Sequence, residues 1–226
     1  GSEMCIRDRN YEYFSEDGVL AGNIGASAVA GAMNQGVYSY IKHFALYEGN
    51  GKMVSVWSNE QAIREIYLKP FEISVKKGGA NAVMVSWSFL GHKWTGENSS
   101  LLNTVLRDEW GFRGMALTDF FRNNGHGFMN ADAALANGVD AMLSTFDGPE
   151  NNVADRSHPT SVKQMRNACK NVMYTVVSSW AYDGGGTSVG METWKKAAIG
   201  LDVVLVLGLA SVEIIVIKGS GKRKEM

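Results

Sequence analysis

The middle of the chain alternates between two hydrophobic patterns, one with helical spacing and one made of short continuous apolar runs. Helical spacing predicts helices over residues 20–33, 59–77, 101–109, 131–136 and 162–178. Pro70 predicts a break in the second of these, because proline cannot continue a helix interior. The apolar runs predict strands over residues 37–44, 82–87, 115–119 and 139–143. The last helix is expected to face the core with Met165, Ala168, Cys169, Val172, Met173 and Val176.

Because the four predicted strands alternate with helices, the pattern indicates parallel βα units. No GxGxxG pattern follows any of the strands, which argues against a dinucleotide-binding site. Polar residues at the strand ends fit half of a (β/α)8 barrel. The predicted fold class is therefore α/β, a partial (β/α)8 TIM-type barrel (its second half) followed by a C-terminal hydrophobic helix. A half barrel leaves a sheet edge uncovered, so we expect further sequence upstream.

The C-terminal region contains a long apolar run, Ala197–Ile217, which is interrupted by Asp202 and Glu213. As a helix it is about 31 Å long, close to the roughly 30 Å hydrocarbon core of a membrane. A buried or amphipathic C-terminal helix is the alternative interpretation. More basic residues follow the run than precede it, so a membrane helix predicts a cytoplasmic C-terminal tail and an extracellular preceding domain. The expected location is the cell membrane.

Composition and charge exclude several classes of function. The 226 residues carry 22 basic and 23 acidic side chains, and the resulting net charge of −1 argues against nucleic-acid binding. Two cysteines are too few for a disulfide framework or a zinc knuckle, and four histidines make a His-rich metal site unexpected. We therefore predict no metal and no cofactor.

The N-terminus lacks a basic region followed by an apolar run, so it predicts no signal peptide and a chain that is incomplete at its front. The run from Met4 to Arg9 resembles translated sequencing-adapter read-through. We therefore expect four regions: residues 1–9 as a non-native segment, 10–182 as the barrel part, 183–194 as a glycine-containing linker, and 195–226 as the membrane helix with its basic tail.

Four segments of the chain carry a specific combination of motifs. Residues 81–120 end in LRDEWGFRGMALTDF, residues 42–44 read KHF, residues 9–17 read RNYEYFSED, and residues 166–179 read RNACKNVMYTVVSS. Over residues 9–182 the chain resembles glycoside hydrolase family 3. The resemblance implies a barrel plus an α/β sandwich domain, which precedes the barrel in some members, and some of those end in a membrane helix. The implied partners are a missing N-terminal part with the sandwich domain and a β-linked oligosaccharide or glycoside substrate.

Asp119 ends one of the predicted strands, where the active-site face of a barrel lies. On the residues alone it could instead cap a helix, since aspartate is a preferred N-cap. The resemblance implies that Asp119 is the nucleophile of a retaining glycosidase, which uses two carboxyl groups about 5–5.5 Å apart. Phe120, beside it, would then line the sugar subsite. Other available carboxylates do not match the family's acid/base: Glu48, Glu97 and Asp132.

Lys42 and His43 stand at the end of another predicted strand and can donate hydrogen bonds to sugar hydroxyls. A solvated lysine and a buried structural histidine are the alternative. The resemblance favours sugar contact, and it implies that Arg9 is a further hydroxyl ligand. Trp87 would stack on a pyranose ring, although a place in the core is also open.

Two departures from the family pattern affect the expected substrate rim. Ser88-Phe89 stand where members usually have Asn-Arg, and residues 47–50 read YEGN where members often have Asn-Asp-Gln-Glu. Glucoside specificity is therefore an open question. Two further tryptophans, Trp57 and Trp110, are expected to pack in the core or at an interface.

Three functions remain open. The first is a retaining glycosidase that hydrolyses terminal β-D-glucosides or related β-glycosides through a covalent glycosyl-enzyme intermediate, here as a fragment that lacks the acid/base and is poorly active alone. The second is a non-catalytic or degenerate carbohydrate-binding, membrane-anchored domain. The third is a membrane-tethered structural domain with no sugar site. Asp119 favours the first over the third, because a structural domain needs no carboxylate at a strand end.

Overall fold

The structure is a computed structural model that describes residues 13–47, 55–121, 127–144, 148–181 and 198–211. The chain divides into two compact units, Gly1–Asp183 and Gly184–Met226. The predicted non-native segment 1–9 and the predicted linker 183–194 lie outside the described residues.

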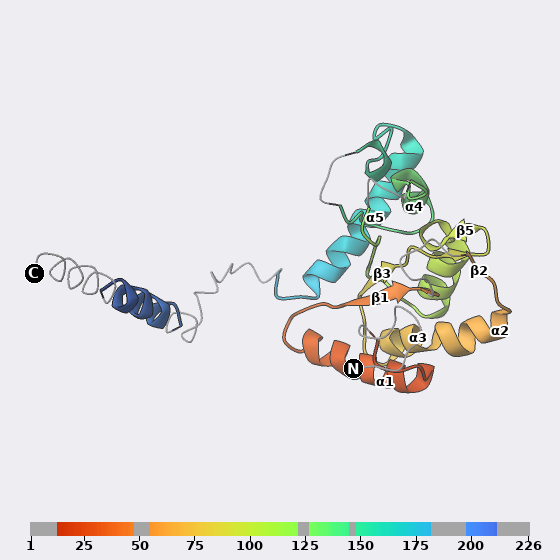
Figure 1. Cartoon of the computed structure of the whole chain (residues 1–226). Coiled ribbons are helices and arrows are strands. Elements are labelled where there is room, and N and C mark those ends of the chain that lie inside the picture. Colours follow the sequence, from red (N-terminus) through yellow and green to blue (C-terminus); the bar gives the residue numbers. More distant parts are fainter. Residues whose placement is uncertain (1–12, 48–54, 122–126, 145–147, 182–197, 212–226) are drawn as a thin grey trace, which may run out of the picture. The chain divides into compact units, whose positions relative to one another are not determined.

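A parallel sheet runs through the first unit (Figure 1). Its three strands are β1 (Tyr40–Phe44), β3 (Ala82–Val85) and β6 (Met115–Leu117), in the order β1-β3-β6. Leu117 forms a further parallel bridge with Ala141, so residues 139–143 lie beside β6. This is an isolated bridge, and the strand predicted over these residues is not formed. Four parallel positions therefore lie side by side, with their carboxyl ends at the same edge.

Helices connect and cover these strands. They are α1 (Gly18–Met33), α2 (Glu60–Ala62), α3 (Lys69–Lys76), α4 (Ala131–Ala136) and α5 (Pro159–Val177), together with the π-helical segments η1 (Ile63–Tyr67) and η3 (Ser100–Glu109) and the 3-10 turns η2 (Thr95–Glu97) and η4 (Pro149–Asn151). The predicted helices are thus confirmed, and the expected break is confirmed near Pro70, which lies in the first turn of α3.

Local side chains explain where several helices begin. Asp17 accepts a hydrogen bond from the backbone N–H of Leu20 at 2.6 Å and so caps α1. Asn59 and Asn130 cap α2 and α4 in the same way. Each cap satisfies one N–H group that the first turn of a helix leaves without an internal partner.

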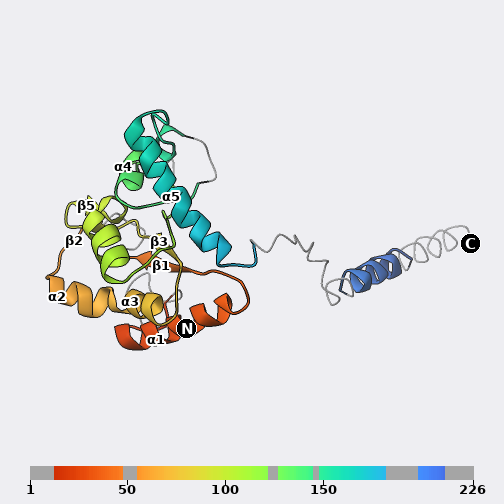
Figure 2. The same ribbon diagram turned by 180° about the vertical axis from the view of Figure 1, so that it is seen from behind.

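The helices α1 and α3 run side by side at one end of the first unit, while α4 and α5 lie at the other end (Figures 1 and 2). Between them lies one buried cluster whose largest members are aromatic or branched: Phe44, Leu68, Phe71, Trp94, Leu102, Leu106 and Trp110. The predicted packing of Trp110 is confirmed. Trp57 does not lie in the core, one of its two predicted places, because 74% of this residue is exposed.

A second, small sheet was not predicted. It consists of β2 (Ser55–Val56), β4 (Phe89–Leu90) and β5 (Lys93–Trp94), with β2 parallel to β4 and β4 paired antiparallel with β5. Gly91 has a φ of 64° in the turn of the β4–β5 hairpin, a conformation that glycine adopts without strain. Two-residue strands are too short to show an alternating pattern, so they could not be predicted from the sequence.

The inward face of α5 agrees in part with the predicted one, because Met165, Val172 and Val176 are half-buried. Ala168 is buried as expected, but Cys169 is exposed and Met173 is 63% exposed. Instead, the buried hydroxyl of Thr175 accepts a hydrogen bond from the N–H of Met115 at 2.8 Å and donates one to the carbonyl of Asn81 at 2.7 Å. These bonds satisfy buried backbone groups of the sheet. The polar Thr175 therefore faces inward, a position that hydrophobic spacing alone would not predict for it.

Within the second unit, residues 198–211 are helical. Among the described residues, no helix is both long and apolar enough to cross a membrane. The predicted membrane span Ala197–Ile217 is therefore not supported by the described part of the structure, and its two ends lie outside that part.

Candidate active site

The carboxyl edge of the parallel sheet brings together residues from three strands. His43 is the second-last residue of β1, Trp87 lies two residues after β3, and Asp119 lies two residues after β6. Because the strands are parallel, these three positions meet at one edge although they are far apart in the sequence. Their proximity is the feature on which the candidate site depends.

Asp119 is 7% exposed and is held close to His43. One carboxylate oxygen, Oδ2, lies 3.5 Å from Nε2 of His43, and the other, Oδ1, accepts a hydrogen bond from the N–H of Phe120 at 2.6 Å. The preceding residue, Thr118, is fully buried, and its hydroxyl oxygen accepts a hydrogen bond from the N–H of Leu143. The backbone that carries Asp119 is thus fixed to the neighbouring strand position.

His43 is also buried and has an oxygen on each side of its ring. Tyr13 places its hydroxyl 3.4 Å from Nδ1 and accepts a hydrogen bond from the backbone N–H of His43 at 2.9 Å. The ring of Tyr47 lies 5.0 Å from that of His43, between ring centres. Tyr13 is therefore a positioning residue that the sequence did not identify, although it lies inside the RNYEYFSED motif.

Trp87 is half-buried and lies next to the backbone of the Asp119 loop. Its indole N–H donates a hydrogen bond to the carbonyl of Phe120 at 3.1 Å, and its ring packs edge-on against Tyr47 with centres 6.4 Å apart. The aromatic rings of Tyr47 and Trp87 and the imidazole of His43 form a continuous wall beside Asp119. Such a wall can pack against an apolar sugar face while the polar groups bind hydroxyls.

Comparison with known proteins decides the family. Residues 3–173 match the family model described as "Glycosyl hydrolase family 3 N terminal domain". The chain belongs to glycoside hydrolase family 3.

Among its relatives, a beta-glucosidase of Rhizobium radiobacter is 42% identical over 118 residues, and probable beta-glucosidase J of Emericella nidulans is 32% identical over 173 residues. These matches cover 51% and 74% of the chain, but only 14% and 20% of the relatives. The chain thus spans a small part of the family 3 proteins that it resembles.

Solved family 3 structures are similar in fold. Beta-glucosidase 3B from Thermotoga neapolitana, in complex with glucose, has a TM-score of 0.69 and 30% identity over 85% of this chain and 28% of its own. A beta-glucosidase from Bifidobacterium adolescentis has a TM-score of 0.70 and 27% identity over 80% of this chain and 27% of its own. These likenesses confirm the predicted barrel-type α/β fold.

Three more residues were predicted for the family 3 site, namely Phe120, Lys42 and Arg9. Phe120 is half-buried beside Asp119. Its backbone N–H donates to the Asp119 carboxylate, and its carbonyl accepts a hydrogen bond from the indole N–H of Trp87. Lys42 is exposed and lines a cavity of about 330 Å³ together with Tyr13. Arg9 lies outside the described residues.

Of the two departures from the family 3 pattern, Ser88 is buried and Phe89 is half-buried. Ser88 is 4% exposed, and its carbonyl accepts a hydrogen bond from the N–H of Thr95. Phe89 packs on Phe128 with ring centres 5.0 Å apart. These two side chains therefore connect the sheet edge to the small sheet. Within the described ranges, no cluster of three or more His, Cys, Asp or Glu side chains is arranged to hold a metal ion.

Proposed function

We propose that this chain carries the nucleophile of a retaining glycoside hydrolase that acts on terminal β-D-glucosides or related β-glycosides. The observation that carries the proposal is the buried Asp119 carboxylate at the end of β6, 3.5 Å from His43 Nε2 and beside Trp87. The printed names of the relatives, which are beta-glucosidases, support the substrate class. In the sequence, Asp119 is the aspartate near the end of the LRDEWGFRGMALTDF motif, which also supports this role.

In the proposed reaction, a carboxylate oxygen of Asp119 attacks the anomeric carbon of the sugar and forms a covalent glycosyl-enzyme ester. The bond to the leaving oxygen breaks, and an acid protonates that oxygen. Water then cleaves the ester and restores the carboxylate. His43 would donate to a sugar hydroxyl, and Trp87 would pack against the ring. We assign the acid/base to no residue of this chain, and we expect the 226 residues alone to hydrolyse glycosides poorly.

Replacement of Asp119 tests the proposal. In the complete product of the gene, Asp119→Ala should lower the hydrolysis rate of an aryl β-glucoside by at least about 10⁴-fold, because no nucleophile remains. Added azide should restore part of the rate, since a small anion can enter the vacated space. The measurement is release of the aryl group.

The matched control is Asp108→Ala, which removes an exposed carboxylate from η3. Its rate should stay within about twofold of the unchanged protein, as is usual for surface substitutions. Efficient turnover by Asp119→Ala without azide would exclude Asp119 as the nucleophile.

A second candidate function is a degenerate carbohydrate-binding domain. The buried Ser88 and the packing of the half-buried Phe89 on Phe128 favour it, because side chains engaged within the protein offer little to a substrate at the rim. A gene product that binds glucose at the Trp87 site but hydrolyses no β-glycoside would support this function. Hydrolysis that depends on Asp119 would contradict it.

Membrane anchoring through Ala197–Ile217, with a cytoplasmic tail, also remains a proposal. What supports it is the apolar run and the excess of basic residues after it. The protein should then stay with membranes after a carbonate wash, and deletion of residues 197–226 should release it. Release of the undeleted protein by the wash would contradict the anchor.

A further inference from the structure

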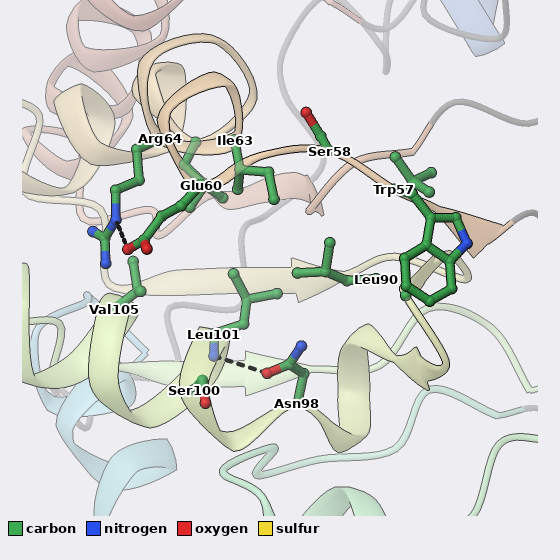
Figure 3. A pocket seen from close by; sticks show the side chains of 13 residues that line it. Trp57, Ser58, Glu60, Ile63, Arg64, Leu90, Asn98, Ser100, Leu101 and Val105 are labelled. Atoms are coloured by element: carbon green, nitrogen blue, oxygen red, sulfur yellow. Dashed lines mark hydrogen bonds and ion pairs between the residues drawn. The ribbon is translucent and has the colours of Figure 1, made fainter.

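A second hollow in the first unit shares none of its lining residues with the Asp119 site. It lies between the small sheet and the segments η1 and η3, and its volume is about 460 Å³. Its floor is apolar and consists of the buried Leu68, Leu101 and Val105. Figure 3 shows Trp57 at one end of this hollow and the Arg64–Glu60 pair at the other. We call it the Trp57 hollow.

Trp57 presents an unusually large apolar surface for an exposed residue, with 74% of its area accessible. One part of its ring rests on the hairpin turn of the small sheet: a Cβ atom added to Gly91 would lie 3.5 Å from the indole. The backbone of Gly91 thus supports the ring from one side and leaves the rest uncovered. An apolar ring held beside a hollow is a feature of binding surfaces, since burying it against a ligand gains about 25 cal/mol per Å².

The charges that line the Trp57 hollow neutralise each other. Arg64 donates from Nε to Glu60 at 2.8 Å, and from Nη1 and Nη2 to Glu109 at 2.6 and 3.0 Å. The Arg64 guanidinium is therefore already bound by two carboxylates and offers little to an anionic ligand. Glu60 is paired with Arg64 through Oε1, so these two lining side chains carry no net charge between them. A neutral ligand fits this lining best.

Uncharged polar groups border the apolar floor. Ser58 and Ser100 are exposed, and Asn98 is half-buried. Asn98 uses its carbonyl oxygen to accept a hydrogen bond from the N–H of Leu101 at 3.1 Å, so its amide NH₂ group is the part that can donate to a ligand. A neutral ligand with an apolar face and several hydroxyl groups matches an indole ring together with these donors and acceptors. A pyranose sugar has both features.

The small sheet also connects the Trp57 hollow to the edge that carries Asp119. The strand β4 begins shortly after β3 ends, and the buried hydroxyl of Ser86 between them donates a hydrogen bond to the carbonyl of Ala45 at 2.8 Å. In addition, Trp94 of β5 donates from its indole N–H to the carbonyl of Ser86 at 2.8 Å. These buried bonds fix the small sheet against the ends of β1 and β3.

We propose that the Trp57 hollow is a second binding site for a neutral β-linked oligosaccharide, in which the indole of Trp57 packs on one sugar ring. The choice of ligand rests on the proposed function, whereas the site itself is separate from Asp119. The bonds of Ser86 fix the small sheet to the ends of β1 and β3, so a saccharide held there is tethered to the same unit that carries Asp119.

Chemical protection of tryptophan tests this site directly. The protein, carrying Asp119→Asn so that the ligand is not consumed, is treated with N-bromosuccinimide with and without cellotetraose, and oxidised tryptophans are quantified by mass spectrometry. At a ligand concentration ten times the Kd, oxidation of Trp57 should slow by roughly tenfold, because only the unoccupied fraction reacts. Trp180, which is 63% exposed at the end of α5, is the internal control and should react at an unchanged rate.

Calorimetric titration with cellotetraose gives the second measurement. Trp57→Ala should weaken the binding at this site by at least about tenfold, whereas Trp180→Ala should leave it unchanged. Unprotected Trp57, or equal affinity in the two variants, would overturn the inference. If Asp119 nevertheless acts as nucleophile, the proposed function stands and only the second site is wrong. If Trp57 is protected but Asp119→Ala remains active, the second site stands and the proposed function is wrong.

Discussion

At the residue scale, a buried acid holds the strand β6, which precedes Asp119 by two residues. The Oδ2 atom of Asp140 accepts hydrogen bonds from Arg107 at 2.7 Å and from the N–H of Ala116 at 2.8 Å, and Oδ1 accepts one from Asn171 at 2.8 Å. Burial raises the pKa of Asp140, while the Arg107 charge and these hydrogen bonds act in the opposite direction. The carboxyl thereby joins β6, η3 and α5 at one point.

Removal of this acid should therefore destabilise the first unit. Asp140→Ala leaves the guanidinium of Arg107, which is 14% exposed, without its carboxylate partner, and the free energy of unfolding should fall by about 3–5 kcal/mol. Urea unfolding measures the difference. Asp108→Ala, which removes an exposed acid from the same helical segment as Arg107, should change it by less than about 0.5 kcal/mol. Equal effects of the two substitutions would show that the Asp140 network contributes no special stability.

The site residues differ in how far the sequence could predict them. Asp119, His43 and Trp87 were identified because motifs place them at strand ends, and the structure brings these three together. Tyr13 and Thr118 were missed, because a hydroxyl that bonds to a backbone N–H leaves no periodic pattern in the sequence. The chemical role of each residue remains a prediction.

At the scale of the elements, the packing of α1 on α3 depends on small residues. A Cβ atom added to Gly22 would lie 2.8 Å from Ile73 and 3.0 Å from Pro70, closer than atoms normally approach. Ala26 of α1 is likewise close to Gly78, just beyond α3. The small residues of α1 thus permit a close approach of two helices.

Two glycines of α1 should therefore respond to alanine in opposite directions. Gly22→Ala should lower the stability by about 1–3 kcal/mol, because the added methyl group overlaps Ile73. Gly31→Ala has no atom within 4 Å of the new methyl group and should raise the stability by roughly 0.5–1 kcal/mol through better helix propensity. Thermal or urea unfolding of both variants is the measurement. A stabilising Gly22→Ala would contradict the close packing.

The elements were predictable where their patterns are long. Helices such as α4 (Ala131–Ala136) were located from spacing alone, and three of the predicted strands form the parallel sheet. The face of α5 was predicted only in part: Ala168 is buried, but Cys169 and Met173 are exposed, and the buried Thr175 makes hydrogen bonds that no hydrophobic pattern indicates. Trp57 was expected in the core or at an interface, and it is exposed, because a single aromatic residue carries no information on whether its side chain is covered.

At the scale of the whole molecule, the first unit is part of a family 3 barrel-type domain, and its parallel strands direct the candidate site to one edge. Residue motifs and their order predicted this domain from the sequence. The membrane helix was predicted from hydropathy and length, and the described residues give it no support. The central claim is thus the chemical role of Asp119 within that domain.

Covalent labelling tests this claim most directly. The complete gene product is incubated with a 2-deoxy-2-fluoro-β-glucoside that has a good leaving group, so that the glycosyl-enzyme forms but hydrolyses slowly. Mass spectrometry of the digested protein should locate one fluoroglucosyl group on Asp119, and Asp119→Asn should abolish the labelling while Asp108→Asn retains it. A label on another carboxylate, or equal labelling of the Asp119→Asn protein, would contradict the claim.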